Sequence, residues 1–235
     1  MAVRRPKAPA SGAVAAPRRS SPPPVLAAGF EPFGGEDVNP SWEICQALPA
    51  AIAHAPVVRL RVPTEFRRAI EVVAEAIDRV EPALVILLGQ AGGRPALSVE
   101  RVAINVDDAR IADNAGAQPI DEAIATGGPA AYFATVPVKA MVAALRAAGI
   151  PAEVSNSAGT FVCHHLLYGV LHFLAASRRE ARAGFIHVPW LEEQALNHPG
   201  QPTMALATMA RGVEIAIAAA LATAVDVKMA AGKLD

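Results

Sequence analysis

The sequence predicts an α/β fold of three layers, in which helices cover both faces of a mixed, mainly parallel sheet. From residue 24 onward, short apolar runs alternate with stretches of helical periodicity, which is the pattern of βαβ units. The run at 84–88 (LVILL) is apolar at every position, as expected for a strand buried on both faces. Apolar residues make up 53% of the chain, which is enough for a substantial core.

The predicted strands are short runs rich in Val, Leu and Ile. The segment VVRLRV is β-branched at both ends, and GFIHV is apolar up to its histidine. One longer segment alternates polar and apolar residues and indicates the arm of a hairpin; it is residues 97–106. The strands are expected, in order, at 25–29, 57–62, 84–88, 97–106, 152–156 and 184–188.

The predicted helices have apolar residues at helical spacing and recognisable ends. Ser41 is a plausible N-cap for the first of them. Pro137 stands in the first turn of the third, where its missing N–H costs little, and Gly149 ends that helix. The last is rich in alanine. The helices are expected at 42–48, 65–80, 137–148, 161–176 and 204–227.

The first 24 residues differ in composition from the rest. They are rich in Pro, Ala, Ser and Arg, hold five basic residues and no acidic one, and show no hydrophobic period. We therefore expect residues 1–24 to be a disordered extension and residues 25–235 to form a single domain. Without the extension the net charge is −6, which argues against a nucleic-acid-binding surface, since such a surface needs a basic face.

The apolar segments are too short to predict a membrane span. The longest nearly apolar run, residues 215–225, has 11 residues, whereas a spanning helix needs about 20. The two cysteines, Cys45 and Cys163, do not make a disulfide framework, which is typical of a reducing compartment. We expect a cytoplasmic protein with neither a membrane nor a nucleic acid as partner.

Cys163 is the first candidate for chemistry. It follows a turn of small residues at 156–160 and lies in the first turn of the next predicted helix, where the helix dipole favours a thiolate. A strand–turn–helix position of this kind is typical of nucleophiles. The alternative is that a free cysteine on a helix is a small buried hydrophobe. We adopt that interpretation for Cys45, which lies in the middle of a predicted helix.

His187 is the second candidate. It lies near the end of a strand, and a right-handed crossover returns it to the sheet edge that Cys163 occupies. A Cys–His pair is the arrangement of an activated nucleophile, and a hydrogen-bonded core histidine is the alternative. No spacing of His, Cys and acidic residues matches a zinc site, so no metal is expected. The pattern does not choose the acid that orients the imidazole; the candidates include Glu31, Glu36, Glu43, Glu100, Asp107, Asp108 and Asp113.

Two glycine-rich turns follow predicted strands, at 29–35 and 89–94. Neither has the glycine spacing of a dinucleotide-binding fingerprint, and no GK[ST] of a P-loop occurs. Phe30 and Phe33 stand in the first turn. They are either part of a packed turn or the apolar wall of a pocket for a small flat ligand.

Eight segments, taken in order, resemble the pyroglutamyl-peptidase I (pyrrolidone-carboxylate peptidase) family over about residues 25–220. They are GFEPFGGEDVNPSWE (29–43), VPTEF (62–66), GQAGGR (89–94), ERVAIN (100–105), DARIADNAGAQP (108–119), GGPAAYF (127–133), SAGTFVCHHLLYG (157–169) and GFIHVPW (184–190).

The resemblance implies a cysteine exopeptidase that removes N-terminal pyroglutamate from peptides without a cofactor. It implies a phosphorylase/hydrolase-like α/β/α domain, often assembled as a homotetramer. The family's catalytic residues fall on Cys163, His187 and Glu100, and an arginine associated with the oxyanion falls on Arg110. The pyroglutamate pocket falls on Phe30, Phe33, Asn39, Thr64, Gln90, Ile111, Phe161 and Val162.

The chain departs from the family pattern at two positions beside these residues. His164 stands where the family usually has Asn, and Ala112 where it usually has Pro. Three other functions are alternatives: an inert pyroglutamyl-peptide binder or scaffold, a glutaminase-like amidase, and a nucleoside phosphorylase by fold analogy alone. The first would be favoured by a missing Cys, His or Glu, and all three are present. The lactam-sized aromatic pocket argues against the second, and the third would need a phosphate site.

Overall fold

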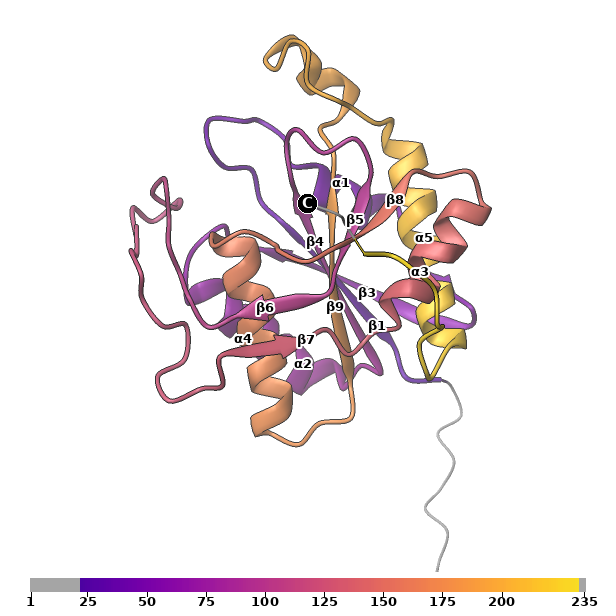
Figure 1. Cartoon of the computed structure of the whole chain (residues 1–235), viewed down its shortest axis with the longest axis horizontal. Helices are drawn as coiled ribbons and strands as arrows, with labels where there is room; N and C mark the ends of the chain where they lie inside the picture. Colours follow the sequence, from indigo (N-terminus) through magenta and orange to yellow (C-terminus); the bar gives the residue numbers. More distant parts are fainter. Residues whose placement is uncertain (1–21, 233–235) are drawn as a thin grey trace, which may run out of the picture.

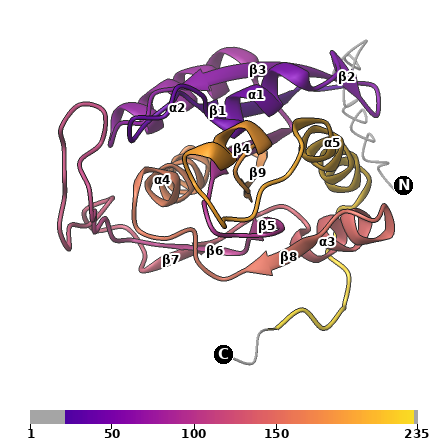
Figure 2. The ribbon, with the colours of Figure 1, turned by 90° about the horizontal axis from the view of Figure 1, so that it is seen from above.

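The computed structural model describes residues 22–232. The expected extension at 1–24 falls almost wholly outside these residues. In the described part, a seven-stranded mixed sheet lies between two layers of helices (Figures 1 and 2). The strands are, in spatial order, β2 (Ala51–Ile52), β3 (Ala55–Val62), β1 (Val25–Phe30), β4 (Leu84–Gln90), β9 (Arg182–Val188), β5 (Leu97–Glu100) and β8 (Ala152–Ser155).

Most strands of the sheet run in one direction. β3, β1, β4 and β9 pair in parallel, whereas β5 runs antiparallel to β9 and parallel to β8. This confirms the predicted α/β class with a mixed, mainly parallel sheet. The apolar residues of β1, β4 and β9 are buried, because both faces of these strands are covered.

The helices form two layers that meet the sheet through separate cores. One core joins the sheet to α2 (Arg68–Val80) and α4 (Val162–Ala176). The other joins it to α1 (Pro40–Ala47), α3 (Val138–Ala147) and α5 (Leu206–Ala222). Since side chains alternate along a strand, Val85 and Leu87 of β4 face the first layer, and Leu84, Ile86 and Leu88 face the second. We call the first side the α4 face.

Several predicted boundaries differ from the structure. The first helix begins at Pro40 and is capped by Asn39, whose Oδ1 accepts a hydrogen bond from the Ser41 N–H; Ser41 is therefore not the cap. The second begins at Arg68, because Arg67 has a left-handed φ of 62° that a helix does not accommodate. The last spans Leu206–Ala222 and is shorter at both ends than expected.

The predicted hairpin arm at 97–106 is two strands in two sheets. β5 ends at Glu100 within the main sheet, and β6 (Val102–Ile104) pairs with β7 (Ala131–Phe133) in a separate two-stranded sheet. The alternating pattern is misleading because both faces of β5 are covered: its four residues are all buried. In β5 the polar and apolar residues therefore do not mark a solvent-exposed face and a buried face.

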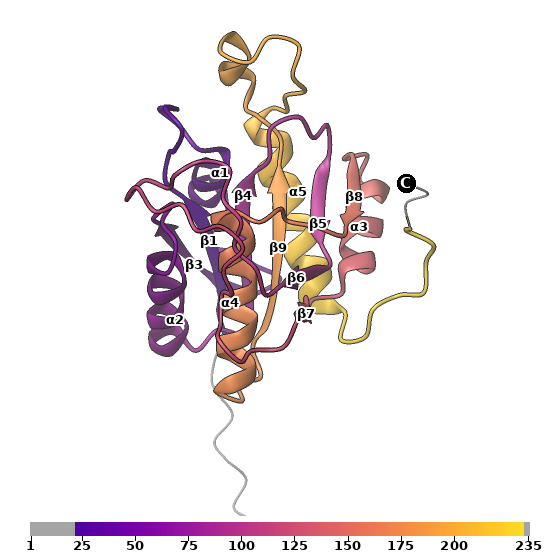
Figure 3. The ribbon, with the colours of Figure 1, turned by 60° about the vertical axis from the view of Figure 1, so that its left-hand side comes forward.

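The two ends of the sheet are next to different segments of the chain. In Figure 3, β9 runs up into the segment with the short 3₁₀ helix η1 (Glu192–Leu196), and the chain enters β1 from the opposite end. The long loop between β6 and β7 also extends from the body of the molecule (Figure 1). In a sheet of this kind, ligand sites form near the carboxyl ends of the strands.

Candidate active site

The predicted catalytic residues meet on the α4 face of the sheet. His187 of β9 shares that face with Phe185, because the two are separated by one residue; their ring centroids are 4.6 Å apart. Glu100 of β5 shares it as well, because its neighbour Val99 belongs to the core on the other side. The strand periods thus aim the acid and the imidazole toward the helix that carries Cys163.

Cys163 lies in the first turn of α4, as predicted, and its sulfur reaches the sheet at Gly89. A Cβ added to Gly89 would lie 2.8 Å from Cys163 Sγ. Gly89 is paired in register with His187 on the neighbouring strand. The missing side chain of Gly89 therefore makes room for the sulfur beside the imidazole. Phe161, at the N-cap of α4, makes no side-chain cap hydrogen bond.

Glu100 holds the imidazole by a buried hydrogen bond. Glu100 Oε1 lies 2.8 Å from His187 Nδ1, and both side chains are almost fully buried. Pattern reading left seven acids open, and the structure brings Glu100 to His187. The same oxygen accepts a second hydrogen bond, 2.7 Å long, from Arg94. Arg94 had no predicted role; it ends the GQAGGR segment six positions before Glu100.

Burial decides the resting protonation of this cluster. It raises the pKa of Cys163 to about 12, and the nearby charge of Glu100 acts in the same direction. Burial also lowers the pKa of His187, against the opposing effect of Glu100. Burial, the largest single effect, would raise the pKa of Glu100, but the hydrogen bonds from His187 and Ser155 and the charges of His187 and Arg94 together outweigh it, and the pKa is lowered. At neutral pH the thiol and the imidazole are therefore neutral and Glu100 is ionised, so the expected helix-stabilised thiolate is not the resting state.

Three phenylalanines form an aromatic cluster next to Cys163. The ring of Phe161 lies 6.2 Å from that of Phe33 and 5.4 Å, edge to face, from that of Phe66. Val162 and Phe30 are buried in the core of the α4 face. Phe33, Phe161, Val162 and Phe30 are among the predicted pocket residues, and Phe66 is an addition to them.

Thr64 and Asn39 converge on the loop after β1. Thr64 Oγ1 and Asn39 Nδ2 both donate to the carbonyl oxygen of Glu31. Asn39 Oδ1 accepts from Ser41. The polar atoms of the Asn39 side chain thus already have partners, and the residue holds the loop that carries Phe33.

Two of the remaining predicted residues, Gln90 and Arg110, line an open cavity of about 400 Å³. Gln90, Arg110 and Phe33 line it together with Gly92, Trp190, His198 and Gln201. Gln90 Oε1 accepts a hydrogen bond from Gln194, and His198 stacks on Trp190 and bonds Glu36. Ile111 is 46% exposed and does not line this cavity. Sequence reasoning missed Trp190, Gln194 and the Glu36–His198 pair, because their segments meet only in the fold.

The two histidines after Cys163 are buried and serve the scaffold. His165 Nδ1 lies 2.8 Å from Asp107 Oδ2, and its Nε2 accepts the Arg67 N–H. His164 Nε2 lies 2.8 Å from the Ile104 carbonyl oxygen, which ties α4 to β6. Burial lowers the pKa of His164, so it adds no charge beside the thiol at neutral pH.

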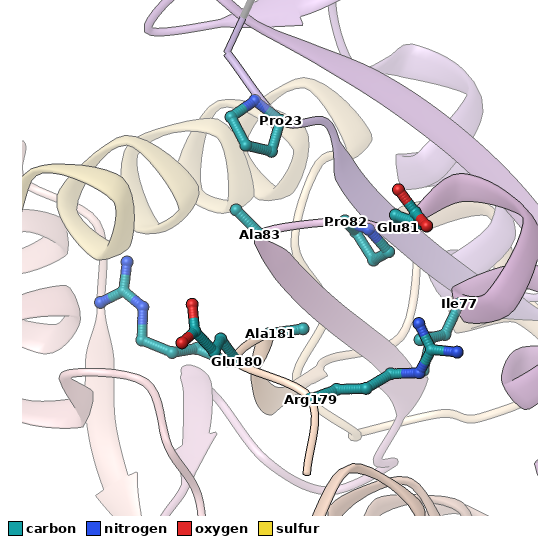
Figure 4. A pocket seen from close by; sticks show the side chains of 9 residues that line it. Pro23, Ile77, Glu81, Pro82, Ala83, Arg179, Glu180 and Ala181 are labelled. Carbon is teal, nitrogen blue, oxygen red and sulfur yellow. The ribbon is translucent and has the colours of Figure 1, made fainter. Parts of the chain in front are cut away.

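Another cavity, of about 530 Å³, lies at the opposite end of the sheet (Figure 4). It is lined by the segments that precede β1, β4 and β9, including Pro23, Glu81 and Arg179. Neither cysteine nor histidine is among its lining residues.

Residues 22–232 contain neither a metal-binding cluster nor a membrane-spanning helix. Within this range no group of three or more His, Cys, Asp or Glu side chains is placed to hold a metal ion. In the same range no helix has the length and apolar character needed to cross a membrane.

The matches to known proteins extend over most of the residues that the structure describes. The profile of the pyroglutamyl peptidase family matches residues 24–223. A pyrrolidone-carboxylate peptidase of Cupriavidus taiwanensis is 57% identical over 214 residues, which cover 90% of this chain and 99% of that protein. One from Bacillus cereus strain Q1 is 50% identical over 204 residues, covering 86% and 95%.

Solved structures agree with these relatives. The crystal structure of pyroglutamyl peptidase I from Bacillus amyloliquefaciens superposes with a TM-score of 0.86 at 43% identity, covering 89% of this chain and all of that one. A mutant pyrrolidone carboxyl peptidase from Pyrococcus furiosus gives a TM-score of 0.81 at 40% identity, covering 84% and 98%. The site geometry and the matched length lead to one assignment: this chain belongs to the pyroglutamyl peptidase family.

Proposed function

We propose that this chain hydrolyses the amide bond after an N-terminal pyroglutamyl (5-oxoprolyl) residue, by way of a thioester between substrate and Cys163. The observation that carries the proposal is the buried hydrogen bond between Glu100 and His187 on the face of the sheet that Cys163 reaches. A nucleophile, a base and a group that orients the base are the elements of an acyl-transfer site. Family membership supplies the substrate class.

The reaction begins from neutral partners. Because burial lowers the pKa of His187, the imidazole is unprotonated at neutral pH and accepts the thiol proton of Cys163 as the sulfur attacks the pyroglutamyl carbonyl carbon. Glu100 accepts a hydrogen bond from Nδ1, which leaves Nε2 to take the proton. The ionised carboxylate also stabilises the imidazolium that forms.

The oxyanion of the tetrahedral intermediate forms near the first turn of α4. The uncapped amide groups of that turn and the guanidinium of Arg110 are the proposed donors. One donor of this kind is typically worth about 2.7–4 kcal/mol in the transition state. Collapse of the intermediate forms the thioester and breaks the C–N bond, and the imidazolium gives its proton to the leaving amine. His187 then takes a proton from water as the water attacks the thioester; the C–S bond breaks, pyroglutamate leaves, and the imidazolium returns the proton to the sulfur of Cys163.

Specificity follows from the chemistry of the pyroglutamyl ring. The ring is a neutral lactam without an α-ammonium group, so it suits an apolar pocket with a few amide partners. We assign the walls to Phe30, Phe33, Phe161, Ile111 and Val162, and polar contacts to Thr64, Gln90 and the backbone, with Asn39 holding the loop. The predicted partners are peptides that begin with pyroglutamate.

The assembly and compartment are proposals as well. We propose a homotetramer, as the resemblance implies. The outer face of the β6–β7 sheet supports self-association, because Ile104 is 44% and Phe133 69% exposed there. Light scattering of the wild type and of Phe133→Ser tests this. We also propose a cytoplasmic location, in keeping with the two free cysteines.

The test is release of the fluorophore from a pyroglutamyl-coumarin amide, for the wild type beside Cys163→Ser. We expect thiol-dependent turnover that the substitution abolishes. Cys45→Ser is the matched control, because Cys45 is fully buried in the opposite core and has no role in the reaction. A reduced, folded wild type without turnover would instead indicate an inert binder, and His164→Asn and Ala112→Pro would be the first reversions.

A further inference from the structure

Arg94 contacts the buried carboxylate of Glu100, but the mechanism above gives it no role. It lies in the loop between β4 and β5, and its side chain is 29% exposed. One guanidinium nitrogen donates to Glu100 Oε1 at 2.7 Å and lies 3.4 Å from Ser155 Oγ. The other donates to the carbonyl oxygen of Ser157 at 3.0 Å. The side chain thus joins its own loop to β5, to β8 and to the turn that leads into α4.

The contact with Glu100 is made at a decisive atom. Glu100 Oε1 accepts from Arg94 and from His187 Nδ1, so one carboxylate oxygen joins the guanidinium to the imidazole. A carboxyl group with a single partner can rotate about its last torsion angle, which is broad. The second, charged partner fixes that torsion and keeps Oε1 on the imidazole.

The contact with Ser157 adds the nucleophile to the same framework. Ser157 begins the short turn between β8 and α4, and Cys163 lies in the first turn of that helix. The guanidinium fork therefore sets the distance between the acid and the turn that places the sulfur. Lysine has one ammonium group and does not reproduce two bonds from separate nitrogens to Glu100 and to Ser157.

Arg94 also separates Glu100 from water. A cavity of about 500 Å³ lies outside it, lined by Arg94, Gly93, Pro95, Glu153, Ser155, Asn156 and Ser157. Glu100 is fully buried and is not among the lining residues. The guanidinium fills the space between this cavity and the carboxylate, so its removal would connect the acid to solvent.

From these contacts we infer that Arg94 is a positioning residue of the reaction. Arg94 orients the Glu100–His187 pair, connects this pair to the turn before Cys163 and shields Glu100 from solvent. The inference rests on the proposed function, in which these three residues carry out acyl transfer. The charged or titratable groups that face Glu100 are His187 from β9, Cys163 and His164 from α4, and Arg94 itself.

The first test compares Arg94→Met and Arg94→Lys with the wild type, with Arg68→Met as control. Arg68 is a surface arginine that pairs only with Glu71 and Glu75 among its described contacts. We expect Arg94→Met to lower kcat at least about tenfold with little change in KM, since a hydrogen bond to a charged group is lost. Arg94→Lys is expected to recover part of kcat, and Arg68→Met to retain the wild-type value.

A pH profile distinguishes positioning from general damage to the fold. The charge of Arg94 lowers the pKa of Glu100, His187 and Cys163 alike. Its loss raises all three, so the acid limb of kcat/KM is expected to move to higher pH in Arg94→Met and to stay near the wild-type position in Arg94→Lys. A lowered kcat with an unmoved acid limb would mean a merely structural role and would overturn the inference, as would wild-type kinetics of Arg94→Met.

Chemical rescue tests the same site with a small molecule. Because Arg94 lines a cavity, Arg94→Ala leaves an opening toward Glu100, and millimolar guanidinium chloride is expected to restore part of kcat. Sodium chloride at equal ionic strength is the control and is expected to restore none. Equal effects of the two salts would count against a specific guanidinium site beside Glu100.

A readout that needs no substrate separates this inference from the proposed function. The rate at which iodoacetamide alkylates Cys163 is measured against pH by mass spectrometry, with buried Cys45 as internal comparator. We expect the profile of Arg94→Met to shift to higher pH. If that shift occurs but the wild type does not turn over pyroglutamyl amides, the proposed function fails and the role of Arg94 stands. Turnover by the wild type without the shift overturns the role of Arg94 alone.

Discussion

Gly89 faces Cys163 so closely that a Cβ on its backbone would lie 2.8 Å from the sulfur and 2.6 Å from Phe185 Cζ. Its φ is not in the left-handed region, so a close approach, rather than backbone conformation, requires a glycine here. The position of Cys163, the proposed nucleophile, therefore depends on a strand residue that lacks a side chain, 74 positions earlier in the sequence.

Gly89→Ala is expected to displace the sulfur from His187. Both contacts are shorter than real Cβ atoms tolerate, and the neighbours are a reactive sulfur and a buried ring. We predict a loss of kcat of at least about tenfold, together with a destabilisation of about 1–3 kcal/mol from overpacking. Gly232→Ala is the control, because nothing lies within 4 Å of its Cβ position. Unchanged kcat in folded Gly89→Ala would refute the placement of the sulfur.

Glu100→Gln tests the acid without changing its shape. The amide retains the size of the side chain but loses the charge that stabilises the imidazolium and fixes the Nδ1–H tautomer. We predict a loss of kcat of about 10²–10⁴, the range for a positioned acid–base group. Steady-state kinetics at several pH values measures it. Glu71→Gln, on the surface of α2, is the matched control and is expected to keep wild-type kcat.

The sequence predicted where Cys163 and His187 lie in their elements because the relevant signals are local. The position of Cys163 after a small-residue turn, and of His187 near the end of an apolar strand, both agree with the structure. The expected right-handed crossover from β8 to β9 was wrong, because β5 is parallel to β8 and antiparallel to β9, so β8 and β9 run in opposite directions and the rule for parallel strands does not apply. The positions of Cys163 and His187 could be predicted because they depend on a few adjacent residues.

The contacts that Glu100 and Arg94 make cannot be predicted from neighbouring residues in the sequence. Glu100 reaches His187 because β5 runs antiparallel to β9. The residue types of β5 do not indicate the direction in which this strand runs. Residues 97–106 looked like one alternating strand, but Arg101 separates two strands in different sheets. Burial, which controls the pKa of Cys163, depends on the packed sheet and overrides the helix-terminus effect that the sequence alone suggested.

Stability is expected to fall below about pH 6.5 because two buried histidines resist protonation. Burial lowers the pKa of His164 and of His187 from the usual value of 6.5. Below that value the unfolded chain binds protons that the folded protein does not, so each histidine contributes a loss of about 1.4 kcal/mol per pH unit until its folded pKa is reached. Above pH 6.5 these two histidines are neutral in the folded and the unfolded chain, so this loss is absent there, and it grows as the pH falls.

His164→Asn isolates one of these two contributions. We predict that urea denaturation at pH 7.5 and at pH 5.5 gives a smaller difference in unfolding free energy for this variant than for the wild type. His54→Asn is the control, because His54 is exposed and its left-handed φ of 68° suits asparagine. An identical pH dependence in wild type and His164→Asn would show that His164 does not resist protonation.

Phe161→Ala tests the aromatic wall of the pocket. Phe161 contacts both Phe33 and Phe66, so its removal opens the cluster that we assign to the pyroglutamyl ring. We predict about a tenfold rise in KM for a pyroglutamyl amide, from the apolar area that the ring no longer buries. Phe173→Ala, near the other end of the same helix, is the control; it also loses a ring but is expected to keep the wild-type KM.

Discrimination between pyroglutamyl and prolyl amides tests the polar part of the pocket. The two rings have nearly the same size, but proline lacks the ring carbonyl and carries a charged secondary amine at neutral pH. A prolyl substrate would bring that charge against an aromatic wall and leave the amide partners of the carbonyl unmatched, and each unmatched buried group costs about 1–3 kcal/mol. We therefore predict that kcat/KM for the prolyl amide is lower by at least about tenfold. Equal kcat/KM for the two substrates would mean that the residues around Gln90 and Phe161 do not recognise the lactam ring.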